Sequence, residues 1–131
     1  MTPQEIFETV SRHLFAQGER AFQLGDANTD GMCMYRGPND TKCAVGCLIP
    51  DDVYLSTMEN KRVNQLVTGD YHLPNFITEN LDLLSELQYV HDRTESWRST
   101  EEMQYQLGRA PRHVGYDLDT TFLADLKFAD R

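Results

Sequence analysis

Cysteine is the residue type in this chain best suited to covalent or metal chemistry, because a thiolate is both a nucleophile and a zinc ligand. The chain has three cysteines, Cys33, Cys43 and Cys47. Cys43 and Cys47 would share one face if their segment were helical, and Cys33 could approach them from a preceding strand. Structural zinc usually takes cysteine pairs from both sides of the site, and only one such pair is present. The histidines that could complete the site are His13, His72 and His91. We expect small, reduced cysteines and no metal or other cofactor.

Cysteine catalysis is the second chemistry that these residues suggest. Cys43 or Cys47 near the start of a helix would have a lowered pKa, and His91 and Asp92 could supply a base and its orienting carboxylate from a distant helix. However, Cys47 is followed by apolar residues that point to the core, and the chain has no nucleophile elbow, phosphate loop or paired-carboxylate motif. We expect no enzyme, and a catalytic set of Cys43, Cys47, His91 and Asp92 is the alternative.

A turn between the cysteines offers the best contact for an anion or a partner. Gly37 opens a stretch rich in turn-forming residues, and Arg36 would place a cation beside its open backbone. Lys42 follows the turn and could add a second cation. The simpler expectation is that Arg36 pairs with a nearby carboxylate or with the carbonyl end of a helix. The candidate ligand or partner contacts are Tyr35, Arg36, Lys42, Asp51 and Asp52.

One loop resembles the first half of a calcium site. Asp26, Asn28 and Asp30 stand where the first, third and fifth ligands would be, and Gly31 stands at the turn position. The twelfth position is Gly37, where a calcium loop has a bidentate glutamate. We therefore expect a polar loop without calcium.

The strings YRGPN and KCAVGCLIPDD, followed further along by LQ-x-x-HD, resemble a family of small uncharacterised proteins from bacteriophage and bacterial genomes. Related sequences often carry Asn-Gly at the turn where this chain has Asn39 and Asp40. The family has no assigned activity. The resemblance therefore implies a provenance and not a mechanism.

Composition limits the function further. The chain has 12 Lys and Arg against 21 Asp and Glu, a formal net charge of −9, and no cluster of cations that could follow a phosphate backbone. We expect no direct nucleic-acid binding. Acidic patches could instead engage a basic protein surface. The odd cysteine count and the polar start indicate a reduced cytoplasm, that of the host if the protein is phage-encoded. No apolar run approaches the ~20 residues that span a bilayer, so we expect no membrane partner.

Hydrophobic periodicity predicts a mainly α (α+β) protein, one domain over residues 1–131, with about five helices around one core and a small β-hairpin near residues 33–45. The segment from Lys42 to Ile49 could instead be wholly helical. The capping box at Thr2 opens the first helix, which we expect to end at Gly25. A second helix is expected to end at Gly69, and a third to span Thr78 to Asp92. A fourth should follow Ser99 until Pro111 bends or ends it, and a last helix should follow Asp119.

These expectations favour an accessory protein that binds a host protein, with inhibition of a defence or nucleic-acid-handling system as its use. The first alternative is a small-anion or nucleotide-binding module that uses Arg36 and Lys42. The second alternative is a cysteine-dependent enzyme.

Overall fold

A computed structural model describes residues 1–27 and 30–129 of the chain. Within these residues the protein is mainly α with a small antiparallel hairpin, so the predicted fold class is confirmed. None of the described helices has the length and apolar character that crossing a membrane requires. The helices are α1 (Pro3–Gln17), α2 (Val63–Thr68), α3 (Asn75–Glu79), α4 (Leu81–Asp92) and α5 (Thr100–His113), and the strands are β1 (Phe22–Gln23) and β2 (Met32–Cys33). Short 3-10 helices cover Pro38–Asp40, Gly46–Leu48, Ser56–Met58, Thr94–Trp97 and Thr121–Asp125.

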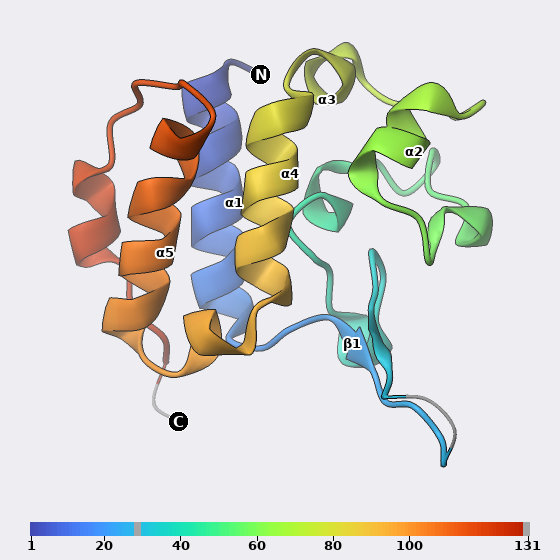
Figure 1. Ribbon diagram of the computed structural model, residues 1–131, viewed down its shortest axis with the longest axis horizontal. Coiled ribbons are helices and arrows are strands. Elements are labelled where there is room, and N and C mark those ends of the chain that lie inside the picture. Colours follow the sequence, from blue (N-terminus) through green and yellow to red (C-terminus); the bar gives the residue numbers. More distant parts are fainter. Residues whose placement is uncertain (28–29, 130–131) are drawn as a thin grey trace.

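Helices α1, α4 and α5 lie side by side, and the hairpin projects away from this helical body (Figure 1). Helix α4 contacts both α1 and α5. Its leucines Leu83, Leu84 and Leu87 are fully buried. Burying a leucine side chain contributes about 2 kcal/mol, so this wide apolar face makes α4 the centre of the core.

Helix α1 begins as predicted and ends earlier than predicted. The Thr2 hydroxyl accepts the Glu5 N–H at 3.1 Å, and the Glu5 carboxylate accepts the Thr2 N–H at 2.8 Å. Gly18 then takes a left-handed conformation (φ 76°) and closes the helix with an N–H bond to the Leu14 carbonyl at 3.0 Å. The prediction that the helix continues to Gly25 is wrong, because the apolar residues beyond Gly18 belong to β1 and its approach.

The strand pair lies earlier in the chain than residues 33–45. Phe22 pairs with Cys33 and Gln23 with Met32 in antiparallel register. Within the predicted range lie Cys33, at the end of β2, and an isolated bridge between Arg36 and Lys42. It closes a tight turn in which Asn39 and Asp40 both have positive φ. The chain then enters turns and a short 3-10 helix, so neither a second ladder strand nor a helix from Lys42 to Ile49 forms.

The later helices depart from their predicted bounds in three places. Asn80 (φ −125°, ψ 39°) separates α3 from α4, so the helix predicted from Thr78 is broken. Helix α5 passes through Pro111 and ends two residues later, at His113. The helix predicted after Asp119 is a 3-10 helix, and the Asp119 carboxylate accepts the Thr121 N–H at 2.9 Å.

Candidate functional site

The three cysteines do not gather into one site. Cys43 is fully buried, and its sulfur accepts the Gly46 N–H at 3.2 Å. The Cys47 thiol donates to the Ala44 carbonyl at 3.1 Å. Burial raises the pKa of Cys43 and raises the pKa of Cys47 to about 12. Neither thiol therefore has the lowered pKa that a nucleophilic cysteine requires.

The cysteine that approaches the histidine and aspartate is Cys33. In the described part of the chain, Cys33, His91 and Asp92 are the only group of three potential metal ligands, and their ligand atoms lie within 4.8 Å of one another. Sequence reasoning paired His91 and Asp92 with Cys43 or Cys47. Cys33 was considered only as a potential metal ligand. No local sequence pattern shows that β2, which carries Cys33, lies beside the end of α4.

Both nitrogens of His91 are already engaged. The ring is fully buried, and Nε2 accepts the backbone N–H of Ala21 at 3.0 Å. Nε2 must therefore be unprotonated, and Nδ1–H donates to the Asp92 carboxylate at 2.8 Å. If Nδ1 bound a metal, the neutral ring would carry its proton on Nε2. That N–H would then point at the Ala21 N–H, so two donors would face each other. This arrangement joins α4 to β1 and disfavours both a catalytic base and a metal ligand at His91.

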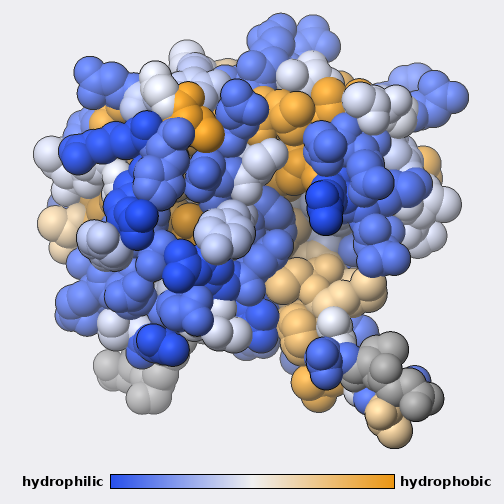
Figure 2. All heavy atoms as spheres, viewed as in Figure 1, coloured by the Kyte–Doolittle hydropathy of each residue, from blue (hydrophilic) through white to orange (hydrophobic). Residues whose placement is uncertain are grey.

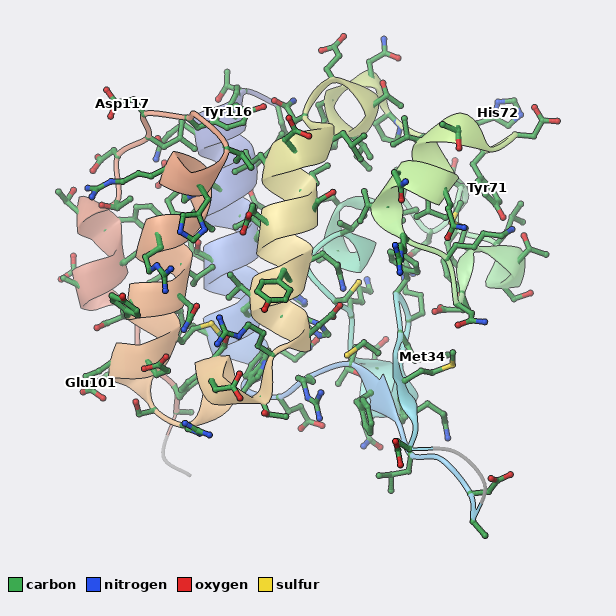
Figure 3. All side chains as sticks on the ribbon, in the orientation of Figure 1. Met34, Tyr71, His72, Glu101, Tyr116 and Asp117 are labelled. Carbon is green, nitrogen blue, oxygen red and sulfur yellow. The ribbon has the colours of Figure 1, made fainter. Side chains whose placement is uncertain are left out.

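The Cys33 thiol also has a strongly perturbed environment. Burial raises its pKa to about 12, and the Asp92 charge acts in the same direction, whereas Arg20, at 3.9 Å from the sulfur, acts against it. A neutral thiol is thus favoured at physiological pH. The other two candidate zinc histidines have structural or exposed positions: His13 Nε2–H donates to the Lys42 carbonyl at 2.8 Å, and His72 is exposed near α2 (Figure 3).

The Cys33 thiol is expected to react slowly with thiol reagents in the native protein. A pKa of about 12 in place of the usual 9.0 reduces the thiolate fraction of Cys33 at neutral pH by roughly a thousandfold. The native protein should therefore react with a thiol reagent at least ~100-fold more slowly than the same protein in denaturant. A single fast thiol in the native state would contradict this result and favour the cysteine-enzyme alternative.

The cations of the predicted contact turn are paired within the protein. Arg36 donates from Nη1 to Asp51 at 2.6 Å and from Nη2 to the Ile49 carbonyl at 2.6 Å. The Lys42 ammonium lies 3.9 Å from the same Asp51 carboxylate. The hydrogen bond from Arg36, with the charge of Lys42, lowers the pKa of Asp51. An anion at this turn would have to displace Asp51.

The remaining contact candidates divide between core and surface. Tyr35 is buried, and its hydroxyl donates to the Lys61 carbonyl at 2.6 Å. Asp52 is exposed. Of the calcium-like residues, Asp26 and Asp30 lie in the connection between the strands, and Asn28 falls outside the described residues.

Glu59 holds the turn in place, a role that sequence reasoning missed. Its carboxylate accepts the N–H groups of Tyr35 and Arg36 at 2.9 and 3.1 Å and the hydroxyl of Tyr54 at 2.6 Å. The sequence around it resembles a capping box opened by Ser56. The 3-10 helix at Ser56–Met58 nevertheless has no side-chain cap.

Replacing Glu59 should therefore weaken the fold. Glu59→Gln replaces one acceptor oxygen by a donor amide, leaving an N–H or hydroxyl opposite another donor, at a cost of about 1–3 kcal/mol. Urea denaturation measures the loss. The exposed Glu79→Gln is the matched control and should change stability by less than about 0.5 kcal/mol. Equal stability of the two variants would show that the Glu59 contacts contribute nothing.

A cavity of about 310 Å³ lies between β2, the start of α2 and the outer side of α4. Cys33, Met34 and Tyr35 form one wall, and Figure 3 shows Met34 beside the hairpin, below α2. A second hollow, of about 330 Å³, lies along β1 and is lined by Arg20, Phe22 and Leu24 among others. The hairpin is thus flanked by two open cavities.

The hairpin side of the molecule presents acids and apolar groups to solvent. Glu19, Asp26, Asp30 and Asp40 are all exposed. Leu24 has 79% of its surface exposed, the highest fraction among the large exposed hydrophobic residues. In Figure 2, hydrophobic side chains gather over the base of the hairpin, whereas hydrophilic residues cover most of the helical body.

The chain was compared with protein families, curated proteins and solved structures. No family model, curated protein or solved structure matches the chain.

Proposed function

We propose that this protein acts by binding another protein, with the hairpin as its main contact. The observation that carries the proposal is the projection of β1 and β2 from the helical body with Leu24 79% exposed (Figure 1). A leucine this exposed buries little apolar surface in the isolated chain, and apolar side chains form the buried centre of protein interfaces. The arm would place Leu24 in an apolar pocket of its partner.

Charge supports a basic partner surface. Arg20, the cation next to β1, is engaged internally: it packs over the Phe22 ring at 4.4 Å and donates to the Asp92 carbonyl at 3.2 Å. The carboxylates of Glu19 and Asp30 are exposed on the same side. Complementary charge raises the rate and specificity of association more than the affinity itself. The partner that fits is a host protein whose basic surface handles nucleic acid, and the use that fits is an accessory or inhibitory one.

Affinity purification from the host, repeated with variants, tests this proposal. Leu24→Ser should strongly reduce capture of a stoichiometric partner, because loss of a central apolar contact costs about 2–4 kcal/mol of binding, roughly 30- to 1,000-fold in affinity. Leu55→Ser, at another exposed leucine (54% exposed), is the matched control and should capture the partner normally. Capture that survives Leu24→Ser would assign the interface to another surface.

Salt dependence tests the charge contribution separately. Partner binding by the wild type should weaken as salt is raised, since exposed charges are screened. Glu19→Gln with Asp30→Asn should reduce that dependence, whereas Glu79→Gln with Asp82→Asn, exposed on α3 and α4, should leave it unchanged. A salt-independent complex would contradict a basic partner surface.

A further inference from the structure

The cavity between β2, α2 and α4, called here the α2–α4 pocket, has the size of a small-molecule site. Its volume of about 310 Å³ lies at the lower end of the ~300–1,000 Å³ range of ligand pockets. Its walls come from three separate segments, residues 33–35, residues 61–64 and the outer face of α4. Such a pocket would hold a metabolite-sized molecule.

The pocket carries positive charge in a protein that is otherwise acidic. Lys61 and Arg62 line it, and both are exposed. The Lys61 ammonium donates to the Tyr71 hydroxyl at 2.9 Å, and neither cation forms an ion pair within residues 1–27 and 30–129. The acidic residue of the pocket is Asp92, whose Oδ1 is already engaged by His91 and by Gln88 at 2.9 Å. Two cations without acidic partners favour a ligand with a carboxylate or phosphate group.

The other part of the pocket is apolar and aromatic. Met34 and Val63 line it together with Tyr89, whose side chain is 57% exposed. The Arg93 guanidinium lies 5.3 Å from the centre of the Tyr89 ring, which helps to hold the ring in place. An exposed aromatic ring at the edge of a pocket offers a flat surface on which a planar group can stack.

We propose that the α2–α4 pocket binds a small molecule in which a flat ring is joined to a phosphate or a carboxylate. The ring lies against Tyr89 and Met34, and the anion lies at Lys61 and Arg62. The site is separate from Arg36 and Lys42, whose charges are paired with Asp51. It is also independent of the protein-binding role of Leu24, which does not line this pocket.

Two probes distinguish the phosphate from the carboxylate: adenosine monophosphate and 4-hydroxyphenylacetate, titrated while backbone amide chemical shifts are followed. We expect at least one of them to shift the amides of Met34, Val63 and Tyr89. Adenosine, which lacks the phosphate, should bind at least ~10-fold more weakly than its monophosphate if the phosphate is the anion recognised. An uncharged analogue of the carboxylate, 4-hydroxyphenylacetamide, is the corresponding control.

Variants assign the contacts. Lys61→Gln with Arg62→Gln should reduce affinity for the bound probe to that of its uncharged analogue, about tenfold or more. Arg112→Gln with Lys127→Gln, two exposed cations outside the pocket, should leave affinity unchanged. Circular dichroism checks that each variant is folded. The proposal is overturned if neither probe shifts these amides, if charged and uncharged molecules bind equally, or if the Arg112 and Lys127 variant loses as much affinity as the pocket variant.

Discussion

Replacing Gly46 by alanine is expected to destabilise the protein by at least about 3 kcal/mol, the upper end of the usual cost of overpacking. A Cβ at this position would lie 2.1 Å from the carbonyl oxygen of Tyr35 and 2.9 Å from its carbonyl carbon. Both are backbone atoms, so no side-chain rotation relieves the contact. Tyr35 cannot easily retreat, because Glu59 accepts its N–H and the Lys61 carbonyl accepts its hydroxyl. Since a domain has only about 5–15 kcal/mol of stability, much of the native population should be lost.

Two other glycines provide matched controls. A Cβ at Gly108, in α5, would meet Leu123 at an ordinary 3.8 Å, so Gly108→Ala should stabilise the protein by up to about 1 kcal/mol through helix propensity. Gly18 has open space around it but a φ of 76°, so Gly18→Ala should cost about 1–2 kcal/mol from backbone strain alone. Urea denaturation of the three variants gives the ranking. A Gly46→Ala protein as stable as Gly18→Ala would mean that the Tyr35 and Gly46 backbones can move apart at little cost.

The parts of the fold that could be predicted have local signals. The capping residues at Thr2 and Ser99 and the apolar spacing of α4 lie within a few residues of the structures that they specify. By contrast, the strands have only two residues each, and their pairing depends on contacts with the end of α4. The turn-rich sequence at residues 37–40 therefore indicated the turn and its Arg36–Lys42 bridge, but not the strand ladder, which lies earlier in the chain.

In the candidate site, too, contacts with a local sequence signal could be predicted and contacts between distant segments could not. The pairing of Arg36 with Asp51 was the simpler of the two expectations and is observed, because opposite charges on either side of a short segment can meet. Three other features depend on segments that are distant in the sequence. The Glu59 carboxylate bonds Tyr35, Cys33 approaches His91, and the two cations of the α2–α4 pocket lie beside residues of β2 and α4. No local pattern predicts such contacts. They appear only when the helices pack.

His91 is the second position where a large effect is expected. Ala21 is fully buried, and its N–H has His91 Nε2 as its acceptor. His91→Leu removes that acceptor, and an unsatisfied buried N–H costs about 1–3 kcal/mol. It also removes the edge-on contact of the ring with Trp97, with centroids 5.9 Å apart, and leaves a branched side chain of similar volume but different shape. The total loss should be about 2–5 kcal/mol, the sum of the unsatisfied N–H and of the misfit of leucine in a site shaped for an imidazole ring.

Glutamine at position 91 separates the hydrogen bond from the packing. Its amide oxygen can reach the place of Nε2 and accept the Ala21 N–H, so His91→Gln should recover about 1–2 kcal/mol relative to His91→Leu.

Asp92→Asn keeps an oxygen that can accept Nδ1–H, and should cost less than about 1 kcal/mol. It should also lower the pKa of the Cys33 thiol, because the Asp92 charge helps to raise that pKa after burial itself. Thermal and urea denaturation rank the variants, and thiol titration follows Cys33. If leucine and glutamine were equally damaging, the bond to Ala21 would not be the contact that joins the hairpin to α4, and the packing against Trp97 would carry that role.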